Sequence, residues 1–91
     1  MNVWIVVQES CVDGEILVNV VPCISKEVAK VVLKEQKETI LKESYHFSKF
    51  SEEEIAEEFE VEESEDSFLI FDPNDTYYED IKIVEKLVQD K

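Results

Sequence analysis

The sequence is poor in residues that break regular structure and in residues that build disulfide or metal sites. Its 91 residues include one glycine, two prolines, two cysteines and one histidine. Collagen-like and linker-rich chains carry far more glycine and proline, so helices and strands should fill most of the length. Two cysteines are too few for a disulfide-stapled secreted domain, and a single histidine cannot supply a two-histidine metal site. We therefore expect neither a metal nor a cofactor.

Long hydrophobic runs and early basic residues are missing as well. The apolar runs of the chain, such as residues 3–7 and 16–18, fall far below the ~20 residues that a membrane-spanning helix needs. A secretory signal begins with Lys or Arg ahead of its apolar stretch, whereas the first basic residue here is Lys26. The sequence therefore predicts a cytoplasmic protein with no membrane partner.

Positive charge is scarce. With 9 basic and 23 acidic residues, the chain has a net charge of −14, which repels nucleic-acid phosphates, so no direct nucleic-acid binding is expected. Hydrophobic residues make up 44% of the chain, which is enough for a core, and 91 residues are too few for two separate cores. We expect a single compact domain over residues 1–91.

The N-terminal part predicts a β-hairpin. Residues 2–9 are β-branched and aromatic without polar alternation, which is typical of a central strand. Asp13 and Gly14 tolerate the positive φ of a type I′ turn, so residues 15–21 should form the returning strand and Pro22 should end the pairing.

This turn also fixes where the two cysteines lie. Counting outward from it places Cys11 opposite Ile16 and Cys23 opposite Trp4, at opposite ends of the hairpin. At about 3.3 Å per residue the two thiols are too far apart to bond within one chain. Both cysteines are therefore expected to be free.

A long helix is expected over residues 26–45, with Ser25 as its N-cap. Val31 and Leu41 fall on its outer face, where apolar residues would signal a homo-oligomer. The face expected to pack on the sheet carries Ala29, Val32, Leu33, Gln36, Ile40 and Phe47.

A second, two-turn helix is expected over residues 52–58. Ser51 and Glu54 match a capping box, and Phe50 with Ile55 match a hydrophobic staple around the same cap. Both patterns fix where this helix begins.

The C-terminal part predicts three strands. Apolar and acidic side chains alternate over residues 59–62, and residues 68–71 are all apolar. With a turn between them, the two segments indicate a second hairpin. Residues 77–89 fit two structures: a strand rich in β-branched residues, which we favour, or a helix behind a capping box at Thr76 and Glu79. The result is an α+β domain in β-β-α-α-β-β-β order, with a mostly antiparallel sheet of about five strands and the long helix on one face.

Two features suggest a calcium site and a catalytic histidine, but each has a simpler structural interpretation. Asp72, Asn74 and Asp75 resemble a calcium loop, but Tyr77 and Ile83 stand where its glycine and bidentate glutamate belong, so a turn is expected. His46 lies near a helix end without a nucleophile or a second histidine, which favours capping or packing.

The acidic run is the one feature that stands out. Residues 52–75 contain 12 acidic residues and no basic one. Such a run usually forms a solvated surface, but alternation with apolar residues predicts that a folded helix and strand display it. The alternative to a solubilising surface is a docking face for a basic protein, where rows of carboxylates imitate nucleic-acid phosphates. The residues expected to bind this partner are Glu57, Glu58, Glu60, Glu62 and Glu63.

Three classes of function follow, and we rank them. First comes a non-enzymatic binding module, such as an inhibitor or immunity-type protein that blocks a nucleic-acid-handling partner. Second comes a homo-oligomeric structural protein, so either a monomer or a homodimer is expected. An enzyme ranks last, because the sequence offers no convergent set of catalytic groups.

Overall fold

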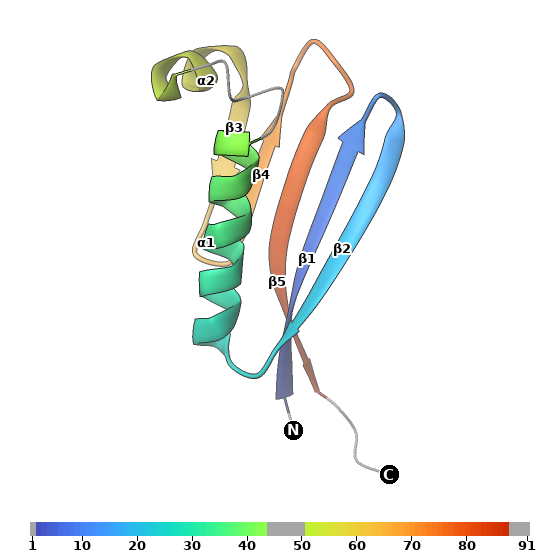
Figure 1. The fold of residues 1–91 in the computed structure, drawn as a ribbon, viewed down its shortest axis with the longest axis vertical. Helices are drawn as coiled ribbons and strands as arrows, with labels where there is room; N and C mark the ends of the chain where they lie inside the picture. The colour runs from blue at the N-terminus through green and yellow to red at the C-terminus, as the bar shows by residue number, and fades with distance from the viewer. Residues whose placement is uncertain (1, 44–50, 88–91) are drawn as a thin grey trace.

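The computed structural model describes residues 2–43 and 51–87 (Figure 1). Two strands come first, β1 (Asn2–Val12) and β2 (Glu15–Cys23), followed by the helices α1 (Lys26–Glu43) and α2 (Glu52–Glu58). Three strands complete the chain: β3 (Glu60–Glu63), β4 (Ser67–Phe71) and β5 (Tyr78–Leu87). The fold is α+β, with one long helix.

The strands form one five-stranded sheet in the order β2-β1-β5-β4-β3, and every pair is antiparallel. The first and last strands of the chain therefore lie side by side in the middle of the sheet, which leaves β2 and β3 as its two edges. The helix α1 lies along one face of the sheet (Figure 1). The opposite face carries no element of the described chain.

The first hairpin has the predicted turn and register. Asp13 and Gly14 take φ values of 52° and 82°, as a two-residue type I′ turn requires. Cys11 pairs with Ile16 and Cys23 with Trp4, and both cysteines are free and buried.

One detail of this hairpin was predicted wrongly. Pro22 does not end the pairing, because β2 continues to Cys23 with Pro22 opposite Ile5. Proline lacks a backbone N–H, but an edge strand needs only every second residue to bond to its neighbour. Pro22 occupies one of the positions that β1 does not need.

The core lies between α1 and the sheet. Residues directly opposite each other in paired strands share a face, and the fully buried side chains follow this rule across the sheet. Phe68 pairs with Ile81, and Ile70 pairs with Glu79, all on the face covered by α1. The buried cluster comprises Val6, Cys23, Ala29, Leu33, Ile40, Ile55, Phe68, Ile70, Tyr77 and Ile81.

The long helix begins as predicted, with the Ser25 hydroxyl accepting a hydrogen bond from the Val28 N–H at 3.2 Å. Its expected end at residue 45 and Phe47 lie outside the described residues. Val31 is exposed as expected, but the placement of Leu41 was wrong, since it packs half-buried against the core. Leu41 lies one turn after Lys37, whose ammonium group lies over the Phe68 ring of β4, so it falls on the side of α1 that packs on the sheet.

The final stretch forms a strand rather than a helix, which decides between the two structures that the sequence allowed there. Residues 88–89 of the predicted stretch lie outside the described residues. β5 pairs with β1 along ten residues and with β4 along five. The second hairpin, β3 with β4, is also present, one residue offset from the predicted bounds. Neither helix, within the described residues, is long and apolar enough to cross a membrane.

Candidate functional site

The predicted glutamates lie at one edge of the sheet. Two come from α2 and three from β3, which follows α2 directly in the chain. We call α2 and β3, with Glu57, Glu58, Glu60, Glu62 and Glu63, the acidic edge. All five side chains are exposed.

The short helix α2 is held in place at both ends. The Ser51 hydroxyl accepts a hydrogen bond from the Glu54 N–H, and the Glu54 carboxylate reaches back to the Ser51 N–H, which completes the predicted capping box. Ile55 is buried in the core cluster, and the Phe59 N–H closes the last turn on the Ile55 carbonyl. Phe50, the other half of the predicted staple, lies outside the described residues. Glu57 and Glu58 are thus displayed from an ordered backbone.

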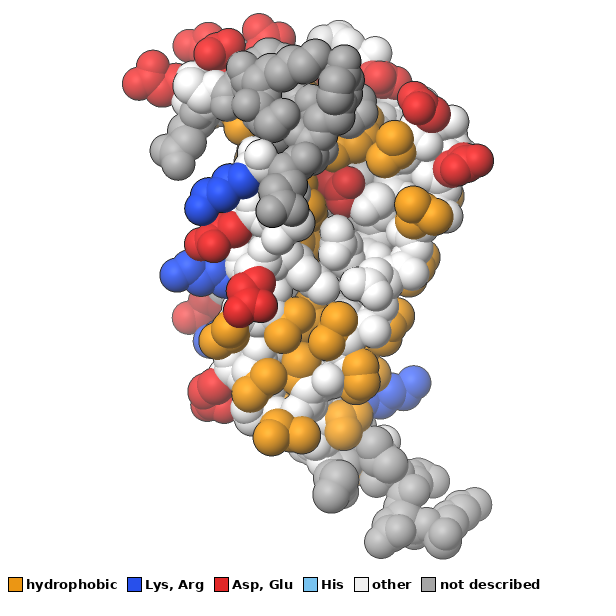
Figure 2. Space-filling view, viewed as in Figure 1, with side chains coloured by type: hydrophobic (Ala, Val, Ile, Leu, Met, Phe, Trp, Pro, Cys, Tyr) orange, Lys and Arg blue, Asp and Glu red, His pale blue; other side chains and the backbone are white. Residues whose placement is uncertain are grey.

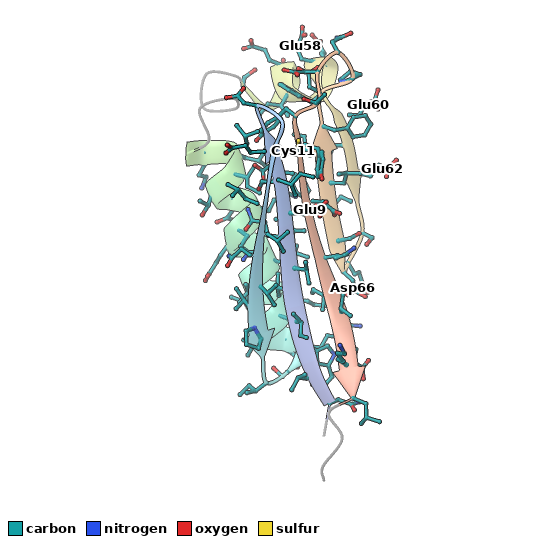
Figure 3. All side chains as sticks on the ribbon, turned by 90° about the vertical axis from the view of Figure 1, so that its right-hand side faces the viewer. Glu9, Cys11, Glu58, Glu60, Glu62 and Asp66 are labelled. Atoms are coloured by element: carbon teal, nitrogen blue, oxygen red, sulfur yellow. The ribbon has the colours of Figure 1, made fainter. Side chains whose placement is uncertain are left out.

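The strand β3 separates its three glutamates onto two faces. Glu60 and Glu62 point away from α1 (Figure 3). Because successive side chains of a strand alternate, Glu63, opposite Phe68, points towards α1. Glu63 forms an ion pair with Lys37 of α1, and the same ammonium group lies 5.2 Å from the centroid of the Phe68 ring. The five glutamates therefore do not share one face, and Glu63 is engaged within the protein.

A second ion pair joins α1 to the turn after β3. Lys26 lies 3.8 Å from Asp66, with both side chains about half exposed. Within the described residues, no cation makes an ion pair with Glu57, Glu58, Glu60 or Glu62. Figure 2 shows acidic side chains gathered over α2, with lysines and further acidic side chains along α1 below them.

The aspartates between β4 and β5 form the predicted turn. The Asp72 carboxylate accepts the Asn74 N–H at 2.9 Å, and the Asp75 carboxylate accepts the Thr76 N–H at 2.6 Å. Within residues 2–43 and 51–87, no three metal-ligating side chains converge on one point. His46 lies outside the described residues.

A buried carboxylate, Glu79, escaped the sequence analysis. It lies on the face covered by α1, where it accepts hydrogen bonds from the hydroxyls of Ser10 and Tyr77. Buried acids need such partners, since an unpaired charge is costly away from water. The alternation of β5 could have placed Glu79 on the same face as Ile81, but its partner Ser10 follows only from the pairing of β1 with β5.

A second acid–hydroxyl pair lies on the opposite face of the same two strands. The Tyr78 hydroxyl donates to the Glu9 carboxylate at 2.7 Å. This hydrogen bond, with the partial burial of the phenol and the nearby negative charge, raises the pKa of Tyr78 to about 12.

The other edge of the sheet is apolar. Four large side chains of β2 are more than half exposed: Ile16, Leu17, Val18 and Val20. We call the outer side of β2, with these four residues, the apolar edge. Within the described residues, no strand pairs with it.

The chain matches no protein-family model, no curated protein and no solved structure. Its function is therefore inferred from the arrangement of its own residues.

Proposed function

We propose that this protein is a small, cytoplasmic, non-enzymatic binding module that docks a basic protein through the acidic edge. The observation that carries the proposal is the set of exposed carboxylates on α2 and β3 that no cation of the described residues neutralises. Two free, buried cysteines fit the reducing conditions of the cytoplasm.

The backbone of the acidic edge supports this proposal over a loose acidic tail. α2 is capped by Ser51 and anchored in the core by Ile55, and β3 is paired with β4. The backbone that carries the carboxylates is therefore ordered before a partner binds. Preorganised charges lose little conformational entropy on binding. A rigid negative surface also steers a basic partner during the encounter.

The partner that fits best carries a cleft that normally holds nucleic acid. Glu60 and Glu62 are two residues apart on one face of β3, which places them about 6.6 Å apart along the strand. This resembles the spacing of neighbouring phosphates on a nucleic-acid strand. An inhibitor or immunity-type role would follow from occupying such a cleft.

Affinity capture with a charge-neutral variant tests the proposal. The variant replaces Glu57, Glu58, Glu60 and Glu62 with glutamine, which keeps side-chain size and leaves the Glu63–Lys37 ion pair in place. We expect proteins captured from lysate at low salt to be lost at about 0.5 M salt, and to bind the variant at least about tenfold more weakly. A DNA oligonucleotide should displace them.

The matched control loses the same charge elsewhere. It replaces the exposed glutamates Glu15, Glu35, Glu38 and Glu85 with glutamine. If both variants weaken capture equally, net charge alone explains the binding and the acidic edge is only a solubilising surface. If capture is unchanged by either variant, the proposed docking face is wrong.

A further inference from the structure

The apolar edge lacks the features that normally keep an edge strand single. Edge strands are usually short, or carry lysine, proline or a bulge along their length. β2 has nine residues, pairs with β1 without interruption, and has no charged residue from Ile16 to Ser25. Its only proline, Pro22, stands next to its last residue. An exposed edge of this kind is a template for another strand.

The register of the hairpin identifies which backbone groups face outward. The pair that closes a two-residue turn, Val12 with Glu15, exchanges hydrogen bonds, and bonded and non-bonded pairs then alternate along the strands. Leu17, Asn19 and Val21 therefore bond to β1. The residues whose N–H and C=O point outward are Ile16, Val18 and Val20, followed by Pro22, which offers a carbonyl only.

We propose that β2 of one copy pairs antiparallel with β2 of a second copy, around a two-fold axis at Val18. In this register Val18 faces Val18, and Ile16 faces Val20 of the other copy. Every outward N–H from Ile16 to Val20 then finds a carbonyl. Centring the pair one residue later, at Asn19, would bring Pro22 of each copy opposite Ile16 of the other and leave the Ile16 carbonyl of both copies without a donor.

The distribution of charge is the reason for choosing a second copy as the occupant. Two chains of net charge −14 repel each other, so they can approach only where each is uncharged. The sheet order places the acidic edge at the side opposite β2. In the proposed register the only charged residue of β2, Glu15, faces Val21 rather than its own copy. A basic partner would find no carboxylate on β2 between Ile16 and Ser25, and the carboxylate of Glu9 on β1, opposite Val18, already accepts the hydrogen bond of the Tyr78 hydroxyl.

The same register buries apolar side chains as well as satisfying the backbone. Ile16, Val18 and Val20 share the face of the sheet opposite α1, where each is more than half exposed. Pairing would place their copies side by side in one apolar row across the axis. Removing such apolar surface from water favours association. This inference does not depend on the proposed basic partner.

The mass of the full chain in solution tests the dimer. Light scattering after gel filtration, at loading concentrations from about 1 to 100 μM, should reach twice the 10.6 kDa of one chain. Val18→Lys places two ammonium groups opposite each other at the axis and should abolish the dimer over that range. Val18 is 59% exposed, so the variant should melt as a folded monomer, which circular dichroism checks.

Two matched variants separate the proposed interface from other ways to dimerise. Val84→Lys changes an exposed valine on the open face of β5, and Val61→Lys changes one on the opposite edge strand, β3. Both should remain dimers. If Val84→Lys dissociates and Val18→Lys does not, the copies meet face to face and the edge pairing is wrong.

Cross-linking tests the register separately from affinity. Val18→Cys places two thiols opposite each other and should give a disulfide-linked dimer on mild oxidation, because the native cysteines are buried. Asn19→Cys, the neighbouring control, should cross-link at least about tenfold more slowly, since its nearest counterpart is Leu17. A native chain that stays monomeric throughout, or faster cross-linking through Asn19→Cys, overturns the proposal.

Discussion

The two edges of the sheet differ in length, charge and protection. β3 has four residues, three of them glutamates, and a second copy placed against it would set carboxylate against carboxylate. β2 has nine residues and no charge beyond Glu15. One edge of the sheet, β3, therefore repels the same edge of a second copy, whereas the other edge, β2, can pair with its counterpart.

This difference shows how a strongly acidic chain can still associate with itself. Repulsion depends on where the charges lie, and β1, β5 and β4 separate the acidic edge from the apolar edge. Pairing through β2 would leave both acidic edges at the far ends of a joined sheet, free for a basic partner. The two proposed surfaces are thus compatible, and each can be disrupted without the other.

The largest expected effect on stability comes from removing the side chain of Phe68, the buried residue of β4 that stands opposite Glu63 of the acidic edge. Phe68 of β4 is 1% exposed and lies beneath Lys37. Phe68→Ala should lower the free energy of unfolding by about 3–5 kcal/mol, because a large buried ring leaves a cavity. Denaturant titration followed by circular dichroism measures the loss.

Phe71 supplies the control for this prediction. It lies on the same strand but on the face opposite α1, and is only half-buried. Phe71→Ala should destabilise the protein clearly less than Phe68→Ala. Equal losses would mean that the open face is covered as completely as the face beneath α1.

A smaller effect is expected at the cap of α2, which carries half of the acidic edge. Ser51→Ala removes the acceptor of the Glu54 N–H and should cost about 1 kcal/mol, with faster amide exchange in α2 than in α1. Glu54→Gln keeps an acceptor for the Ser51 N–H and should be milder. Exchange that is unchanged by Ser51→Ala would show that Ile55 alone holds the helix.

Local signals in the sequence predicted the elements but not their neighbours. Asp13 and Gly14 fixed the register of the first hairpin because a type I′ turn admits few residues, and Ser51 with Glu54 marked the start of α2 because the capping box is contained within one turn. Both signals act over a few residues. They carry no information on which distant strand comes alongside.

For this reason the sequence could not predict which strands form the edges of the sheet. The pairing of β1 with β5 joins residues 67 to 85 positions apart, and together with the pairing of β4 with β5 it makes β2 and β3 the outer strands. Without it, Pro22 appeared to end a strand that continues, and Glu63 appeared to belong with Glu60 and Glu62. The ion pair of Glu63 with Lys37 could be predicted only by knowing that α1 packs on the face of the sheet where Lys37 lies over Phe68 of β4.

A modest effect on stability is expected from removing the ion pair that joins Glu63 of the acidic edge to Lys37 of α1. Lys37→Gln removes the ion pair with Glu63 and the contact with the Phe68 ring. Both groups of the ion pair are partly exposed, so the loss should be about 0.5 kcal/mol and should shrink as salt rises. Lys34→Gln, an exposed lysine of the same helix, controls for net charge. Equal effects of the two variants would show that Glu63 gains nothing specific from Lys37.

The smallest effect on stability at neutral pH is expected from the hydrogen bond between Tyr78 of β5 and Glu9 of β1, two strands that lie between the edges. Tyr78 ordinarily titrates at 10.0, and donation to Glu9 is the main cause that raises its pKa to about 12. A folded-state pKa above the unfolded value means that the stabilisation is complete below about pH 10 and is lost as pH rises through about 12. Absorbance of the phenolate near 295 nm follows this titration.

Two variants test whether the transition near pH 12 belongs to Tyr78 and whether Glu9 causes the raised pKa. Tyr78→Phe should remove this transition, which separates this phenol from those of Tyr45 and Tyr77. Glu9→Gln keeps an oxygen that accepts the hydrogen bond but removes the charge that opposes the phenolate, so the Tyr78 midpoint should move down towards 10. Tyr78 lies on β5, and Glu9, although it stands opposite Val18, lies on β1 and offers no backbone group to the outer side of β2. Neither variant should therefore dissociate the dimer or abolish the capture of a basic partner. A native titration with no transition above pH 11 would show that the hydrogen bond to Glu9 does not form in solution.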